Sequence, residues 1–202
     1  EFVNNHFTSG ALPTIQNWID QVSDGMRLYS SNGPVVVRCN ELVNVAMGFV
    51  VGGDHMDLIA NTVEYFSRDG IATGGHFNRF VGNRIYDSVK LGDVHHDDFF
   101  QSHMGANPDT SSDVEITGNI FINRYGPGQP ADSLGATQCL SGFEDGPKRR
   151  LRITNNVCKG DHWHGITWYD TNNSVIVNNT AVGGSDSAGL PPGSSSWPNY
   201  SW

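Results

Sequence analysis

Two short segments concentrate the side chains that can carry acid–base chemistry. The first, DVHHDDFFQSH at residues 93–103, contains His96, Asp98 and His103. The second, DHWHGITWYD at residues 161–170, places His162 and His164 two residues apart, which puts both on one face of a strand. Imidazoles and carboxylates exchange protons with a bound substrate, and aromatic side chains offer flat faces to sugar rings. Together the segments predict a site that acts on a polysaccharide.

Residue type assigns a role to each candidate in and near these segments. Candidate acids and bases, with an arginine to neutralise a substrate carboxylate, are His96, Asp98, Glu144, His164 and Arg68. Candidate sugar contacts are Gln101, His103, His162, Trp163, Trp168 and Tyr169. Asp97 and Asp145 are candidate calcium ligands because Ca²⁺ takes oxygen donors, and zinc held by histidines is a weaker alternative. A structural alternative stays open, since Asp98 can cap backbone N–H groups at a bend and Gln101 can join an amide ladder.

A repeat marked by asparagine has to position these residues. The asparagines are Asn17, Asn40, Asn61, Asn83, Asn119, Asn156 and Asn179. Successive gaps are 23, 21, 22, 36, 37 and 23 residues, so two of the units are lengthened. The residue three positions before each of the last six asparagines is apolar: Val37, Leu58, Phe80, Ile116, Ile153 and Ile176. A glycine–apolar pair recurs in the same phase, at Gly25-Met26, Gly48-Phe49, Gly70-Ile71, Gly142-Phe143 and Gly165-Ile166.

Units of this length, with brief β-branched runs and Gly/Asn bends, predict an all-β fold, a parallel β-helix of about seven rungs. Stacked rungs bring like residues together, so the asparagines should form an internal amide ladder. Aligning rungs on the glycine–apolar pair predicts that Asp98 stacks with Ser141 and His164, and Gln101 with Glu144. A leucine-rich repeat has a similar period, but leucine is scarce; helical repeats lack the 3.6-residue periodicity.

The composition of the chain indicates its domain boundaries and argues against some classes of partner. Residues 1–184 form one predicted domain and residues 185–202 a Pro/Gly/Ser-rich tail; the chain starts inside a rung, so we expect further rungs or a cap upstream. A net charge of −9 argues against nucleic acid, and no apolar run is long enough for a membrane span. Three cysteines, Cys39, Cys139 and Cys158, leave at least one unpaired and fit no metal spacing.

Three segments carry a family resemblance. NTVEYFSRDGIATGG, HHDDFFQS and DHWHGITWYDTNNSVIVNNTAV resemble right-handed parallel β-helix proteins of the pectate-lyase-like superfamily. They are similar in particular to a bacterial and phage-associated group with H-D-D-G-F-Q-S and D-H-W-H-G-I-T segments, although Phe99 stands where that group has glycine. The resemblance covers about residues 17–184 and implies the fold without fixing an activity.

The fold that the resemblance implies is a right-handed single-stranded parallel β-helix. The leading functional interpretation is a secreted or virion-associated protein that acts on uronate-containing polysaccharide. As a lyase, it would use His96 or His164 to remove the C5 proton while Arg68, Lys90 or calcium neutralises the carboxylate. As a hydrolase, it would use Asp98 with Glu144. The alternative is a non-catalytic glycan-binding or structural rod, such as a phage tailspike, virion component or surface adhesin, assembled as a homotrimer.

Overall fold

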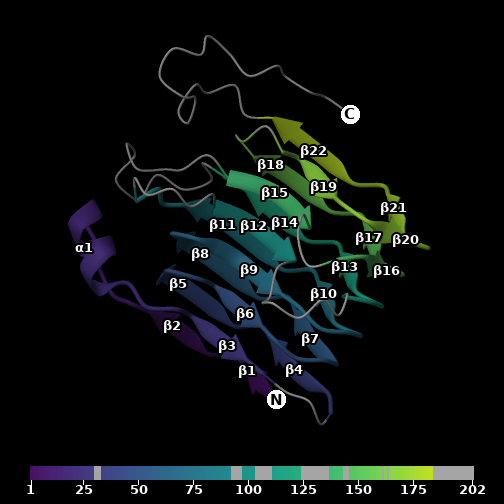
Figure 1. Ribbon diagram of the computed structural model, residues 1–202. Coiled ribbons are helices and arrows are strands. Elements are labelled where there is room, and N and C mark those ends of the chain that lie inside the picture. Colours follow the sequence, from purple (N-terminus) through teal and green to yellow (C-terminus); the bar gives the residue numbers. More distant parts are fainter. Residues whose placement is uncertain are drawn as a thin grey trace.

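The computed structural model describes residues 1–29, 33–91, 97–102, 111–123, 137–142, 146–160, 162 and 164–183. Within these ranges the chain is all-β, apart from one short helix, α1 (Ile15–Gln21). The strands form three large parallel sheets, and each successive unit of the chain adds one strand to each sheet in turn (Figure 1). The predicted all-β, parallel-stranded character is therefore confirmed.

The order of strands within each sheet follows the order of the chain. The first sheet contains β1 (Phe2–Val3), β4 (Val35–Arg38), β7 (Met56–Ile59), β10 (Arg79–Val81), β13 (Glu115–Thr117), β17 (Arg152–Thr154) and β21 (Val175–Val177). The second contains β2 (His6–Thr8), β5 (Glu41–Val45), β8 (Thr62–Phe66), β11 (Arg84–Ser88), β14 (Ile120–Ile122), β18 (Val157–Gly160) and β22 (Thr180–Gly183). The third contains β3 (Met26–Leu28), β6 (Phe49–Val51), β9 (Asp69–Thr73), β12 (Asp97–Ser102), β15 (Thr137–Gly142) and β19 (Ile166–Trp168). A short pair, β16 (Lys148–Arg149) and β20 (Thr171–Asn172), flanks them.

The hydrophobic core consists of columns of like residues that run through the three sheets. The predicted apolar position of the first sheet is one such column, since Val37, Leu58, Phe80, Ile116, Ile153 and Ile176 are paired in register. All but Ile176, on the last described strand of that sheet, are buried. Burying each such side chain stabilises the fold by roughly 1.5–3 kcal/mol.

The predicted asparagine ladder joins the first sheet to the second. Around Asn83, the Oδ1 atom accepts hydrogen bonds from the backbone N (3.0 Å) and Nδ2 (3.0 Å) of Asn61. Its own Nδ2 donates to Asn119 Oδ1 (3.0 Å) and to the Leu58 carbonyl (2.9 Å). The side chain thereby uses all four of its hydrogen-bonding positions. The ladder members are Asn5, Asn40, Asn61, Asn83, Asn119, Asn156 and Asn179.

Asn17 was wrongly assigned to this ladder. It lies in α1, where its backbone N donates to the side chain of the N-cap residue Thr14 (3.1 Å). Asn5 takes its place, 35 residues before Asn40, so the first unit is also lengthened. Asn17 lies 23 residues before Asn40, a spacing that matches the repeat only because the helix is inserted into the middle of the first unit.

A second error concerns the register of β15. The structure pairs Leu140 with Phe100, whereas the glycine–apolar alignment put Phe143 opposite Phe100, a slip of three residues. Cys139, which therefore lies opposite Phe99, forms a disulfide across the core with Cys158 of β18, and Cys39 is free. Phe99 packs into the core between Phe66 and Phe121, with ring centroids 5.8 and 6.0 Å away. Phe99 and Cys139 thus occupy the position at which the preceding unit has Gly70, so an alignment based on glycine gives the wrong register there.

Candidate functional site

The connections between the second and third sheets differ widely in length. They span residues 9–25, 46–48, 67–68, 89–96, 123–136 and 161–165, and we call the edge that they share the variable corner. All three lengthened units place extra residues in it. Insertions in repeat proteins gather in loops on one face, often the binding face. The variable corner is therefore the first place to look for a site.

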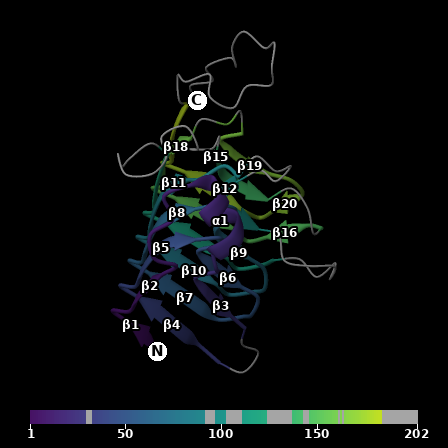
Figure 2. The same ribbon diagram turned by 90° about the vertical axis from the view of Figure 1, so that its left-hand side faces the viewer.

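Helix α1 lies over part of the variable corner, in front of the stack at the level of β8 and β9 (Figure 2). Its Trp18 is fully buried in a small second cluster with Leu12, Tyr65 and Val89, outside the main core. The helix forms here because Thr14 caps it and its apolar residues repeat at helical spacing. The docked helix forms one wall of a pocket.

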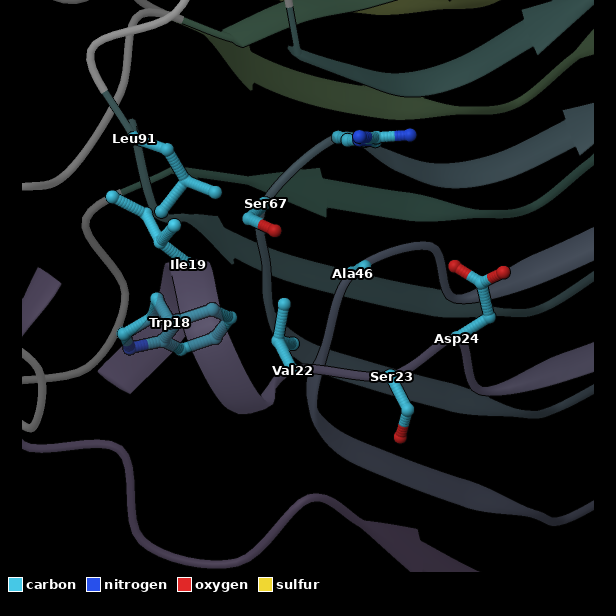
Figure 3. Close-up of a pocket in the computed structure, with 9 residues that line it drawn as sticks. Trp18, Ile19, Val22, Ser23, Asp24, Ala46, Ser67 and Leu91 are labelled. Carbon is cyan, nitrogen blue, oxygen red and sulfur yellow. The ribbon is translucent and has the colours of Figure 1, made fainter. Parts of the chain in front are cut away.

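The pocket has a volume of about 560 Å³, within the usual range for small-molecule sites. Its lining is Trp18, Ile19, Val22, Ser23, Asp24, Ala46, Ser67, Arg68 and Leu91 (Figure 3). It therefore combines residues from α1, from two short connections of the variable corner, and from the connection that follows β11.

Arg68 supplies the positive charge of the pocket. Its side chain is exposed, and no described residue forms an ion pair or side-chain hydrogen bond with it. The other charged residue of the lining, Asp24, accepts a hydrogen bond from Arg27 Nε (2.7 Å), so it already has a cationic partner. Ser67 is 1% exposed, and its hydroxyl has no hydrogen-bond partner among the described residues. The pocket can therefore offer its guanidinium to an anionic ligand.

The third sheet, beside this corner, carries the other described candidates. Gln101 is half-buried and lies outside the core cluster that contains Phe100, and Ser141 is its neighbour in register. Asp98 pairs with Gln138 and Asp69, not with Ser141 as expected. It is 0% exposed and accepts a hydrogen bond from Ser141 Oγ (2.9 Å). Asp98 is therefore a structural acceptor that does not reach solvent in this structure.

His162 and His164 lie together further along the stack. Their rings are stacked with centroids 5.6 Å apart, the backbone N of His164 donates to His162 Nδ1 (3.3 Å), and Thr167 Oγ1 lies 3.4 Å from His164 Nδ1. Continuing the pairing of Leu140 with Ile166 aligns His164 with Gln138, three strands from Asp69. At about 4.8 Å per strand, His164 is about 14 Å from the strand that follows Arg68. His164 and Arg68 are therefore too far apart to contact the same sugar residue.

The two aromatic candidates lie in different environments. Trp168, expected as a sugar platform, packs toward the core: its ring centroid is 6.4 Å from that of Phe100, and it covers Gly142, where a Cβ atom would collide with it. Tyr169 is 53% exposed at the surface. His96, His103, Glu144, Asp145 and Trp163 lie outside the described residues.

The predicted calcium site finds little support among its described residues. Asp97 is buried, and its Oδ1 lies 3.8 Å from Lys90 Nζ. Within the part of the chain that the structure describes, no group of three or more His, Cys, Asp or Glu side chains is placed to hold a metal ion. Asp145, the other predicted ligand, lies outside the described residues, so the calcium site stays a prediction.

Sequence reasoning found Arg68 but missed its surroundings. Trp18 and Ser67 were not singled out, because α1 was taken for a rung and Ser67 has no distinctive neighbour. The available signals were the Thr14 cap and the apolar positions Ile15, Trp18, Ile19 and Val22, which repeat at helical spacing.

Comparisons of the chain with protein-family models, with curated proteins and with solved structures gave no match. Among the described residues, no helix is long and apolar enough to cross a membrane. The functional conclusion rests on the geometry of the corner and the chemistry of its side chains.

Proposed function

We propose that the protein is a right-handed parallel β-helix of the pectate-lyase-like kind that binds and cleaves an acidic extracellular polysaccharide. The fold proposal is supported by three sheets that gain one parallel strand per unit, and by the ladder that repeats with them. Handedness and family membership remain part of the proposal, and rest on the resemblance of the sequence segments.

The observation that carries the functional proposal is Arg68 in the pocket of the variable corner. It is a guanidinium without an ionic partner among the described residues, beside a wall that the lengthened first unit builds. A guanidinium matches the planar geometry of a carboxylate and binds it through two hydrogen bonds. Uronates carry that carboxylate on every sugar, so Arg68 would hold one of them.

Of the two cleavage chemistries, β-elimination fits better than hydrolysis. Hydrolysis by the predicted pair requires Asp98, which is buried and bonded to Ser141. Elimination requires a base near the sugar whose carboxylate is neutralised. The base takes the C5 proton, a C4–C5 double bond forms, and the C4–O bond breaks with its electron pair going to the departing sugar oxygen, which takes up a proton. His96 directly precedes β12 and Arg68 directly precedes β9, and these strands are neighbours. His96 is therefore the proposed base, and no step uses calcium.

An extracellular location is part of the proposal. The Cys139–Cys158 disulfide supports it, because disulfides persist in oxidising compartments and are rare in reducing ones. A polysaccharide partner is also consistent with the exposed Tyr169 and with histidines at His162 and His164, which would contact sugars further along the same chain.

The test is an incubation of the protein with pectate, alginate and a neutral glycan, followed by ultraviolet absorbance of the unsaturated product and by reducing ends. We expect absorbance to grow with an acidic substrate and to be lost in His96→Ala and Arg68→Gln. The matched control is Arg84→Gln, an exposed arginine on the second sheet, which should keep the activity. Reducing ends without absorbance would show hydrolysis and overturn the elimination mechanism.

The second candidate is a non-catalytic rod that binds the same polysaccharide, as a tailspike, virion component or adhesin, with a homotrimer as its assembly. The burial of Asp98 favours it, since that removes one predicted acid from contact with substrate. Binding of acidic glycans without release of any product, unchanged by His96→Ala, would decide for this candidate.

A further inference from the structure

The pocket of the variable corner has two chemically different halves. One half is apolar. It contains Ile19 of α1, the C-cap residue Val22, Ala46, and Leu91 from the connection after β11. The other half is polar, with Arg68, Ser23 and the buried hydroxyl of Ser67. The hydroxyls and carboxylates of unsubstituted uronates match the polar half, whereas the apolar half would contact only ring C–H groups.

The apolar half is open to a ligand. Ile19 is 54% exposed although it belongs to the pocket lining. Figure 3 shows Ile19 and Leu91 on one side of the pocket, with Asp24 on the other side and the Ser67 hydroxyl turned away from Leu91. Covering such a side chain with a methyl group of a ligand is favourable, at roughly 0.8 kcal/mol per buried CH₂ group.

We propose that this pocket recognises an O-acylated uronate, O-acetyl in the simplest case, with the carboxylate on Arg68 and the acyl group against Ile19 and Leu91. The proposal rests on the proposed function and narrows its substrate. A methyl ester on the carboxyl group would also bring a methyl group, but it would remove the negative charge that Arg68 is placed to bind. The apolar substituent must therefore sit on a ring hydroxyl.

Ser67 completes the recognition of an ester. An acyl ester adds a carbonyl oxygen, which accepts hydrogen bonds, and it removes a hydroxyl donor. Ser67 is 1% exposed in the pocket wall, and its hydroxyl has no partner among the described residues. Leaving a buried polar group unpaired costs free energy, so a ligand carbonyl that accepts from Ser67 would relieve that cost.

The experiment is calorimetric titration of the protein with chemically O-acetylated pectate and alginate oligosaccharides, and with the same samples after mild alkaline deacetylation. The variants are Ile19→Ser in the apolar half and Val182→Ser as its matched control. Val182 is a similarly exposed aliphatic residue on β22, outside the pocket lining. Both positions are about half exposed, so neither change should unfold the protein.

We expect the parent protein and Val182→Ser to bind one of the two acetylated samples about fourfold more tightly than its deacetylated form, as one methyl group predicts. Ile19→Ser should bind both forms with similar affinity while retaining the affinity for the deacetylated form. Equal binding of both forms by the parent protein would overturn the inference and leave the proposed function standing. Binding of neither form would overturn the proposed function and the inference with it.

Discussion

The connections at two corners of the stack of strands differ in how much their length varies. Between the first and second sheets every connection has two residues, a residue with positive φ and then a ladder asparagine, as in Ala60-Asn61 and Gly82-Asn83. At the variable corner the connections range from residues 67–68 to residues 9–25. The inner asparagines of the first corner, such as Asn83, use every hydrogen-bonding position of their side chains. The second corner contains the pocket and Arg68, which has no ionic partner among the described residues.

We interpret this difference as a separation between the ladder that stabilises the fold and the surface that we propose to bind substrate. The asparagine corner fixes the spacing of successive units, because an inserted residue would break bonds to the units on both sides. The variable corner has no such ladder, so added residues there change the surface without changing the core. We expect changes at the first corner to alter unfolding, and changes at the second to alter binding.

The largest expected effect is that of Asn83→Leu in the ladder. It removes the two hydrogen bonds that Asn83 Oδ1 accepts from Asn61 and the two that its Nδ2 donates to Asn119 and Leu58, at about 1–3 kcal/mol for each buried group left unsatisfied. We expect a loss of about 3–5 kcal/mol in the free energy of unfolding, measured with urea. Asn17→Leu in α1 is the matched control and should change stability by less than about 1 kcal/mol. Equal losses in both variants would contradict the role assigned to the ladder.

The disulfide should contribute almost as much. Cys139 and Cys158 are separated by 19 residues, and closing a loop of that size is worth about 3 kcal/mol in the chain-entropy model. The double variant Cys139→Ala/Cys158→Ala should therefore lower the free energy of unfolding by about that amount. The Cys39→Ala variant, which removes the free cysteine, serves as the control. A double variant as stable as this control would show that the cross-link is unnecessary.

Backbone strain at the asparagine corner should have a smaller effect on the free energy of unfolding. Gly82 has a φ of 65°, and a Cβ atom added there would meet no atom within 4 Å, so Gly82→Ala isolates the cost of the left-handed backbone. That cost is about 1–2 kcal/mol, partly offset by the reduced freedom of the unfolded chain. Gly183→Ala, which is also uncrowded and has no positive φ, should be nearly neutral. If Gly82→Ala and Gly183→Ala had the same midpoint of urea unfolding, the left-handed backbone at Gly82 would carry no measurable strain.

A deletion at the variable corner should contrast with all of these. Removing residues 125–133, which lie outside the described residues, should change the free energy of unfolding by less than about 1 kcal/mol, because loop closure depends weakly on loop length. The same deletion should weaken binding of acidic oligosaccharides, because we expect inserted connections of the variable corner to contact the ligand. Unfolding and titration of one preparation measure both, and unchanged binding would remove the second claim.

The smallest effect is electrostatic and involves the turns that precede β13 and β17. The hydrogen-bonded Arg150 guanidinium, with Nε 2.6 Å from Asp113 Oδ1, lowers the pKa of the Asp113 carboxyl. The pair therefore adds stability above the ordinary pKa of aspartate, about 3.9, and this contribution is lost as pH falls through the lowered value. NMR titration should show a higher pKa of Asp113 in Arg150→Gln, and an unchanged pKa would contradict the pairing.

The sequence predicted the parts of the fold that repeat. The asparagine ladder and the apolar column from Val37 to Ile176 were readable because each position recurs in successive units. The errors came where a unit departs from the pattern. Asn17 kept the spacing while lying in an inserted helix, and β15 was misaligned because Cys139 and Phe99 replace the glycines of earlier units.

The site was harder to predict for the same reason. Arg68 was identified by its chemistry, but its pocket depends on α1 and on Leu91, which belong to lengthened connections without counterparts in other units. Burial of Asp98 likewise depends on the three-dimensional neighbours of β12, and its sequence context of polar residues gave no sign of it.

The most direct test of the division between the two corners is the affinity of three proteins for pectate and alginate oligosaccharides: the parent, Arg68→Gln and Arg84→Gln. We predict that the parent and Arg84→Gln bind alike, and that Arg68→Gln loses at least about tenfold in affinity, as expected for one charge-assisted hydrogen bond. All three should unfold at the same urea concentration. Undiminished binding by Arg68→Gln would contradict the assignment of function to the variable corner.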